Sequence, residues 1–202
     1  MALGRPPRDR RSEIIEIAGP LFLEHGYQGT SMSRIAAALG GSKGTLYAYF
    51  DSKEALFEAY MEDRVRQRGA AVFNLPPHPA DLHDVLRLLG KRYLGLITDE
   101  VSLALVRLLY HEAPRFPEIG RIFYETCILR GRRHLAEYLK RADEHGALRI
   151  PDAEVAAQHF LALCQATLSM PVMLCIKDVI TEEETERAVE SAVSVFLAAY
   201  AV

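Results

Sequence analysis

Apolar side chains recur every three or four positions along most of this 202-residue chain. That spacing keeps them on one face of an α-helix, whereas a half-buried strand would alternate polar and apolar residues at every second position. We find no segment with such alternation, and we predict an all-α protein of about nine helices.

Polar residues mark where several of these helices begin. Ser42 and Ser52 each precede a run with helical periodicity, and their hydroxyls can accept a hydrogen bond from an amide of the first turn. Thr181 and Glu184 have the spacing of a capping box, in which each side chain bonds the backbone of the other residue. These residues predict the starts of the third, fourth and last helices.

Two segments need closer attention. Pro20 falls inside the first predicted helix, where it has no N–H to donate to Glu16, so we expect a bend there. The apolar run over residues 151–176 is predicted to form one helix, the eighth. Its glutamines, hydroxyls and histidine are too many for a lipid-facing span, so we expect a buried or interface helix and no membrane partner.

The most informative stretch lies between residues 30 and 50. A short predicted helix ends in Leu39-Gly40-Gly41-Ser42, and a second short helix follows with a lysine, hydroxyls and aromatic residues. Two short helices joined by a glycine-containing turn are typical of a helix-turn-helix. A helix of this size fits the major groove of DNA, which is about 12 Å wide. Taken alone, the second segment is equally compatible with a capped, solvated surface helix.

A longer series of matches surrounds this stretch, and we list them in chain order: Ile14-Ile15, Leu21-Phe22, Gly26-Tyr27, Thr30-Ser31-Met32, Ile35-Ala36, Ser42-Lys43-Gly44-Thr45-Leu46-Tyr47, Tyr49-Phe50 and Ser52-Lys53-Glu54-Ala55-Leu56-Phe57. In this order and without gaps, they resemble the DNA-binding domain of TetR-type transcriptional regulators. The later segment Glu112-Ala113-Pro114-Arg115-Phe116-Pro117-Glu118, with Phe123-Tyr124, is similar to the regulatory half of an AefR-like subgroup. The resemblance implies a three-helix head over 1–53 with a basic N-terminal arm, and a larger helical ligand-binding and dimerisation domain over 54–202.

The same resemblance implies double-stranded DNA as a partner. Bases would be contacted by the leading end of the second short helix, and phosphates by the aromatic residues and lysine that follow. The expected DNA-binding residues are Arg5, Arg8, Thr30, Ser31, Ser42, Lys43, Gly44, Thr45, Tyr47, Tyr49 and Lys53. Leu46 and Phe50 are expected to face inward. The turn departs from the family pattern at Gly41, where a β-branched apolar residue is common.

Charge and cysteine content agree with this picture. The net charge is −3, but residues 1–53 carry seven Lys or Arg against five Asp or Glu, so the N-terminal part is positive. Such a distribution suits a head that faces DNA. Three cysteines with no CxxC spacing indicate free thiols and a cytoplasmic protein.

Polar or soft side chains interrupt the apolar faces of the later helices. In the family, a ligand cavity lies among the corresponding helices, so we expect a small apolar or amphipathic effector. The predicted lining residues are Tyr93, His111, Phe123, Cys127, His159, Phe160, Cys164 and Met173. A stripe of Met, Phe and Cys at helical spacing is also what plain core looks like, and both interpretations stay open.

The last two predicted helices carry broad apolar faces. In relatives they pair with a second copy as a four-helix bundle, which implies a homodimer here. The predicted interface residues are Leu163, Thr167, Val189, Ala192, Val193, Phe196 and Tyr200.

The resemblance therefore implies a repressor that binds a palindromic operator as a homodimer and is released by its effector. Two other classes remain: a sensing or protein-binding module whose head no longer recognises DNA, and an enzyme in the helical body. No metal-ligand spacing, nucleophile motif or phosphate-binding loop supports an enzyme, and no cofactor is expected.

Overall fold

The computed structural model describes residues 9–76 and 81–202, and these residues are helical with no strand. The chain divides into two compact units. The head unit comprises the described part of Met1–Val65 together with Ala104–Thr126, and the body unit comprises Arg66–Leu103 and Cys127–Val202. The predicted all-α class is confirmed.

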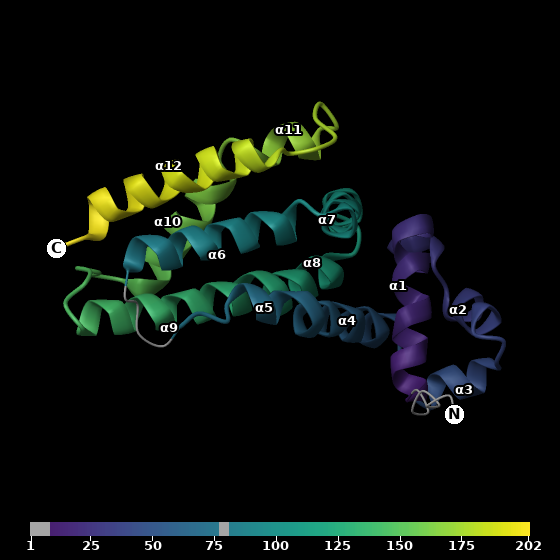
Figure 1. Cartoon of the computed structure of the whole chain (residues 1–202). Coiled ribbons are helices and arrows are strands. Elements are labelled where there is room, and N and C mark those ends of the chain that lie inside the picture. The colour runs from purple at the N-terminus through teal and green to yellow at the C-terminus, as the bar shows by residue number, and fades with distance from the viewer. Residues whose placement is uncertain (1–8, 77–80) are drawn as a thin grey trace, which may run out of the picture. The chain divides into compact units, whose positions relative to one another are not determined.

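The head unit is built on six helical segments, which Figure 1 labels: α1 Arg10–Gly29, α2 Met32–Ala38, α3 Lys43–Tyr47, α4 Lys53–Arg64, the second part of α7 Glu100–Glu112, and α8 Pro117–Phe123. Fully buried side chains from α1, α2, α3 and α4 form its interior, among them Phe22, Ile35, Leu46 and Phe57. Phe22 meets Phe57 edge to face, with ring centroids 5.2 Å apart. This aromatic packing holds α1 against α4.

The break in the first helix lies at Gly26 rather than at Pro20. Gly26 has φ 74° and ψ 167°, whereas Pro20 sits inside the helix. A positive φ is accessible to glycine at little strain, and it turns the chain out of the helical path. The predicted bend at Pro20 is replaced by a sharp change of direction six residues later.

The body unit contains α5 Ala70–Val72, α6 Leu82–Ile97, α9 Arg130–Glu144, α10 Ala153–Gln165, α11 Ser169–Met173 and α12 Glu182–Tyr200. Within it, α10 packs against α6, α9 and α12, and α6 packs against α12 (Figure 1). The core between them is filled by side chains such as Leu89, Leu139, Phe160, Val189 and Phe196.

The predicted eighth helix is two helices. α10 ends at Gln165 and α11 begins at Ser169, so the single helix expected over residues 151–176 is wrong. Leu168 is buried in the core at this break, and its burial helps to hold the turn. No helix of the described residues is long and apolar enough to cross a membrane.

Two helices change to π-helical winding where the chain passes from one unit to the other. The segment η1, Val65–Gly69, joins α4 to α5, and the segment η2, Tyr124–Leu129, joins α8 to α9. Two of the three unit boundaries fall within these segments, and the third lies within α7. A π-helical turn widens the backbone and is found mostly at positions under functional or packing constraint.

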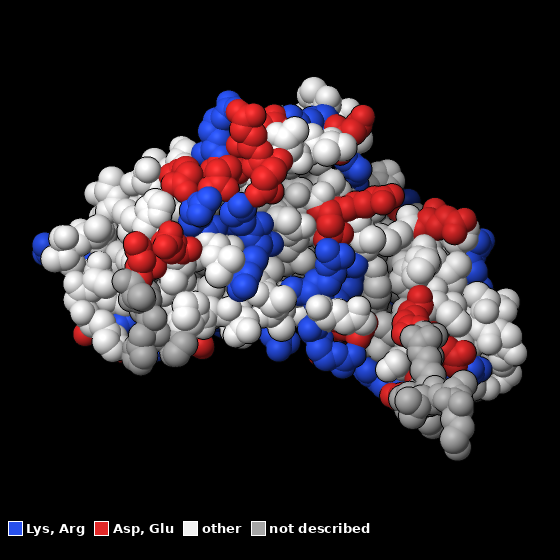
Figure 2. All heavy atoms as spheres, in the orientation of Figure 1, with Lys and Arg blue, Asp and Glu red and all other residues white. Residues whose placement is uncertain are grey.

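Ion pairs join the polar faces of α6 and α12. Lys91 Nζ lies 2.8 Å from Glu186 Oε2, and Arg87 pairs with Glu186 and with Glu190, the latter at 2.8 Å. Figure 2 shows basic and acidic side chains intermixed in the region of these two helices. Because the pairs are partly exposed, we expect them to fix the register of α6 on α12 more than to add stability.

The capping box at the start of α12 is confirmed. Thr181 Oγ1 accepts from the amide of Glu184, and the carboxylate of Glu184 accepts from the amide of Thr181. Lys177 donates to the same carboxylate. The hydrogen bond from Lys177, with that from the Thr181 amide, lowers the pKa of Glu184 to about 2.

This lowered pKa predicts a pH-dependent contribution to stability. Because the folded pKa lies below the ordinary value of 4.5, ionised Glu184 stabilises the fold above that pH, and the contribution falls as pH decreases toward 2. Glu184→Gln keeps a capping-box residue but loses the charge. Urea unfolding should show the variant less stable at pH 7 and closer to wild type at pH 3.5. A difference independent of pH would contradict the assignment.

Candidate nucleic-acid interface

The turn between α2 and α3 is fixed by two backbone hydrogen bonds. Gly40 N donates to Ala37 O and Gly41 N donates to Ala36 O, each at 3.1 Å. This is the Schellman pattern of a helix end, and it places Gly40 in the left-handed region at φ 66°. Gly40 therefore ends α2 and turns the chain toward α3.

The segment α3 is capped and anchored as predicted. Ser42 Oγ accepts from the amide of Thr45 at 3.1 Å and lies 3.0 Å from Thr45 Oγ1. Leu46 is fully buried and Phe50 is 3% exposed, so both face inward as expected. Arg11 of α1 lies over the Phe50 ring, with its Cζ 5.0 Å from the centroid.

The remaining side chains of this segment face outward. Ser42, Lys43 and Gly44 are exposed and Thr45 is half-buried. Tyr47 and Tyr49 are 48% and 44% exposed. The structure thus brings together one outward face of polar and aromatic residues, carried on an anchored helix.

Of the two residues predicted at the start of α2, only Ser31 is accessible. It is exposed and caps α2 by accepting from the amide of Arg34. Thr30 is fully buried, and its hydroxyl donates toward the carbonyl oxygens of Leu21 and Gly26 at 2.9 and 2.7 Å. Its predicted DNA contact is corrected to an internal role, because the side chain has no access to a ligand.

Lys53 has internal partners at the start of α4. Its Nζ donates to the carbonyl oxygen of Tyr27 at 2.7 Å and lies 4.0 Å from the centroid of the Tyr27 ring. Burial lowers its pKa. The predicted phosphate contact of Lys53 must therefore coexist with a structural role inside the head unit.

Sequence reasoning did not identify Tyr27 as the residue that organises this region. The side chain is fully buried, and its hydroxyl donates to Glu54 Oε1 at 2.8 Å. Burial, and then the hydrogen bond to Glu54, raise the pKa of Tyr27, so it remains a donor. Phe116 packs edge-on against the ring at 5.4 Å. The only sequence signal was that both residues belong to motifs shared with the family.

The remaining predicted DNA contacts, Arg5 and Arg8, lie outside the described residues. Their role stays a prediction.

The predicted ligand-lining residues fall in both units. Phe160 and Cys164 are fully buried in the body core, where Phe160 meets Phe196 edge to face, and burial raises the pKa of the Cys164 thiol to about 12. His111 is exposed in the head unit, and His159 is exposed with its Nδ1 2.8 Å from Tyr200 Oη. Phe160 and Cys164 are therefore interpreted as core residues, and His111 and His159 as surface residues, rather than as the lining of a cavity.

The other members of that set are partly buried and fall in both units: Tyr93, Cys127 and Met173 in the body unit and Phe123 in the head unit. Burial raises the pKa of Tyr93 to about 12, with a smaller contribution from nearby Cys164. Tyr93 packs against the hydrophobic core of the body unit.

The predicted dimer residues divide between two faces. Four of them point into the body core and are at most 2% exposed: Val189, Ala192, Val193 and Phe196. For Val189, Val193 and Phe196 the prediction is wrong, because α6 and α10 already cover that face of α12. Leu163 and Tyr200 are half-buried and Thr167 is exposed.

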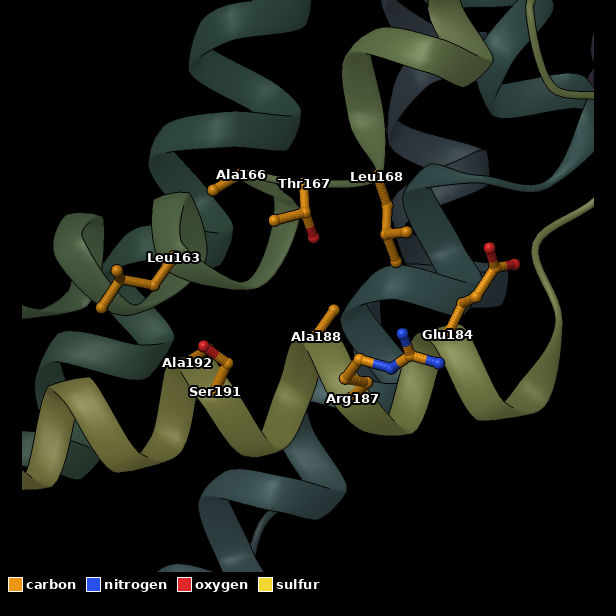
Figure 3. A pocket seen from close by; sticks show the side chains of 9 residues that line it. All are labelled: Leu163, Ala166, Thr167, Leu168, Glu184, Arg187, Ala188, Ser191 and Ala192. Atoms are coloured by element: carbon orange, nitrogen blue, oxygen red, sulfur yellow. The ribbon is translucent and has the colours of Figure 1, made fainter.

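A hollow of about 370 Å³ lies between α12 and the end of α10 with the turn that follows it (Figure 3). Its lining is formed by small and apolar residues with one acidic and one basic side chain, namely Leu163, Ala166, Thr167, Leu168, Glu184, Arg187, Ala188, Ser191 and Ala192. Leu163, Thr167 and Ala192 of the predicted interface line this hollow.

Comparison with known families matches nearly the whole chain. The family described as "Bacterial regulatory proteins, tetR family" matches residues 14–60, and "AefR-like transcriptional repressor, C-terminal domain" matches residues 84–202. The HTH-type transcriptional repressor AcnR of Corynebacterium glutamicum is 42% identical over 67 residues, which are 33% of this chain and 36% of that protein. ComR of Escherichia coli, also an HTH-type transcriptional repressor, is 43% identical over 68 residues, 34% of this chain and 32% of that protein. The match thus spans about a third of these curated relatives.

Solved structures match over the full length. The Flavonoid-responsive Regulator FrrA is 36% identical and has a TM-score of 0.83, covering 95% of this chain and 97% of that protein. A structure from Mesorhizobium loti, assigned to the TetR family of transcriptional regulators, is 29% identical with a TM-score of 0.85, covering 98% and 100%.

The two adjacent turn glycines should respond oppositely to the same substitution. A Cβ on Gly41 would meet Arg10 Nη2 at 3.5 Å and Leu39 Cδ2 at 3.8 Å, which are ordinary contacts, and Gly41 has no positive φ. Gly41→Val should raise the free energy of unfolding by roughly 0.5–1 kcal/mol. Gly40→Val should lower it by about 1–2 kcal/mol, because a β-branched residue is strained at positive φ. Chemical denaturation measures the free energy of unfolding of both variants. A lower value for Gly41→Val than for wild type would contradict the prediction.

Proposed function

Because the chain belongs to the TetR family of DNA-binding transcriptional regulators, we propose that it is a repressor that binds a palindromic operator as a homodimer and is released by a small effector. The relatives AcnR and ComR are named repressors, which supports the direction of regulation. The observation that carries the proposal is the outward face of α3, whose polar and aromatic side chains stand on a buried anchor of Leu46 and Phe50.

In this proposal, α3 enters the major groove. Lys43 and Thr45 contact base edges, and the exposed hydroxyls of Tyr47 and Tyr49 donate to backbone phosphates. Ser31 and Ser42 lie at helix starts on the same polar side and contact the backbone as well. A two-fold dimer would place its two α3 segments in successive major grooves, about 34–36 Å apart on relaxed DNA.

Gly44 provides a sharp test of close approach to DNA. A Cβ at this position would meet only Ser42 Oγ at 3.6 Å, so the protein itself does not require glycine. Gly44→Ala should therefore raise helix stability by about 0.5–1 kcal/mol while weakening DNA binding. Lys43→Ala should lower affinity for the selected sequence by about 1–3 kcal/mol, with much less effect on random DNA.

Both variants would be titrated against duplexes that the wild-type protein selects from a random library, with fluorescence anisotropy as the measurement. If Gly44→Ala and Lys43→Ala bind these duplexes like wild type, α3 is not the DNA-binding element. If the wild-type protein selects no sequence, the sensing or protein-binding alternative gains support.

We infer that a second copy covers the hollow on α10 and α12. Small side chains such as Ala166, Ala188 and Ser191 allow helices to approach closely, and the lining carries one acidic and one basic residue, Glu184 and Arg187, which a two-fold copy can meet with opposite charge. This surface replaces the inward-facing residues that the sequence suggested.

The dimer surface can be tested with two exposed alanines. Ala166 lines the hollow, whereas Ala71 of α5 is exposed elsewhere in the body unit. Light scattering should give wild type and Ala71→Arg twice the 22.6 kDa chain mass, and Ala166→Arg a mass shifted toward one chain. A dimer in all three proteins would place the interface elsewhere.

The effector is proposed to be small and apolar or amphipathic. Support comes from FrrA, which is named as responsive to flavonoids and matches this chain over 95% of its length. Since Phe160 and Cys164 are packed in the core, an effector among these helices has to displace core side chains or bind beside the half-buried Tyr93.

A further inference from the structure

The segment Glu112–Glu118, noted as an AefR-like motif, lies against the head helices within the head unit. Glu112 is the last residue of α7. Its Oε1 accepts from the amide of Tyr27 at 3.0 Å, and its Oε2 accepts from the amide of Gln28 at 2.7 Å. One carboxylate thus holds two consecutive backbone amides that are 85 and 84 residues away in sequence.

These two amides follow the break at Gly26. Because Gly26 departs from helical backbone angles, the amides after it no longer follow the regular i to i−4 pattern and need other acceptors. A carboxylate offers two oxygens, and hydrogen bonds to a charged acceptor are stronger than neutral ones. Glu112 therefore meets the hydrogen-bonding need of this turn with a single side chain.

The fit extends to Gly26 itself. An ideal Cβ built on Gly26 would lie 2.2 Å from Glu112 Oε1. The missing side chain makes room for the carboxylate, and the positive φ aims the next two amides at it. Gly26 and Glu112 are complementary, although each was noted in the sequence only as part of a separate motif.

Neighbouring residues of the same motif hold the same connector. Phe116 packs on the Tyr27 ring at 5.4 Å, and Arg115 Nη1 donates to Gln28 Oε1 at 2.9 Å. Beyond Gln28, the chain passes through the buried Thr30 to the cap of α2 at Ser31. The position at which α2 begins is therefore fixed from the end of α7 and the turn that follows it.

We propose that Glu112 is a positioning residue for DNA binding, which holds the turn between α1 and α2 so that α2 and α3 present their outward face in one orientation. It does not touch DNA. The inference rests on the proposed role of α3, and it adds that the regulatory half of the sequence supplies a part that the DNA-binding head requires.

The test compares Glu112→Gln with Glu125→Gln, which removes the same charge from an exposed position of the same unit. A glutamine keeps the size but presents an NH₂ donor to one of the two amides, so one hydrogen bond is lost. Glu112→Asp keeps the charge on a shorter side chain and should recover part of the loss.

The measurement is affinity for the duplexes selected by the wild-type protein, at 25 °C and under conditions where circular dichroism shows every variant folded. Because Glu112→Gln loses a charge-assisted hydrogen bond, we expect it to bind the duplexes with an affinity about tenfold or more below that of wild type. Glu112→Asp should have an affinity between those of Glu112→Gln and wild type, and Glu125→Gln should bind like wild type. Amide exchange without DNA should be faster in α2 and α3 of Glu112→Gln, and unchanged in α12.

The outcomes separate the two proposals. If wild type selects duplexes and Glu112→Gln binds them with wild-type affinity, the positioning role is overturned while the DNA-binding role stands. Equal acceleration of exchange in α2, α3 and α12 would also overturn it, because it would show general destabilisation. If wild type selects no duplex but exchange changes only in α2 and α3, the positioning of these helices is supported and the proposed operator binding is not.

Discussion

The head depends on one constraint: the backbone has to leave α1 and begin α2 without burying an unpaired polar group. Four side chains meet this constraint. Glu112 accepts the amides of Tyr27 and Gln28, Lys53 donates to the Tyr27 carbonyl, Thr30 donates toward earlier carbonyls of α1, and Ser31 caps α2. Because a buried polar group left unpaired costs about 1–3 kcal/mol, these partners determine the path of the chain.

The need for such anchoring follows from the lengths of the two helices. α2 has seven residues and α3 has five, far below the roughly 12–15 residues at which isolated helices become even marginally stable in water. Their structure therefore comes from packing and from their ends. Leu46 and Phe50 hold α3 from beneath, Ser42 caps it, and the turn at Gly40 fixes its angle to α2. What remains free is the outward face, which is what a binding surface requires.

The features predicted best from the sequence are those that depend on residues only a few positions apart. The caps at Ser42 and Thr181 depend on residues three positions away, and the inward direction of Leu46 depends on helical spacing. The choice of face on α12 is not local, since small and apolar residues occur on several sides and only the packing of α6 and α10 selects Val189 and Phe196 as core. The break after Gln165 carries no glycine or proline within residues 165–168, and the bond from Glu112 to Tyr27 joins residues 85 apart.

The chain crosses three times between the two units, each time along a helical segment. It passes between the units at 65/66, 103/104 and 126/127, and each passage lies at or within a helical segment: at η1, within α7 and within η2. π-helical turns are rare and are frequently found at functional sites. The second passage is distinctive because α7 begins in the body unit and ends at Glu112, whose carboxylate holds the start of the helix-turn-helix. Any displacement of Glu112 has to break those two hydrogen bonds, so the path of the chain from α1 to α2 depends on the position at which α7 ends.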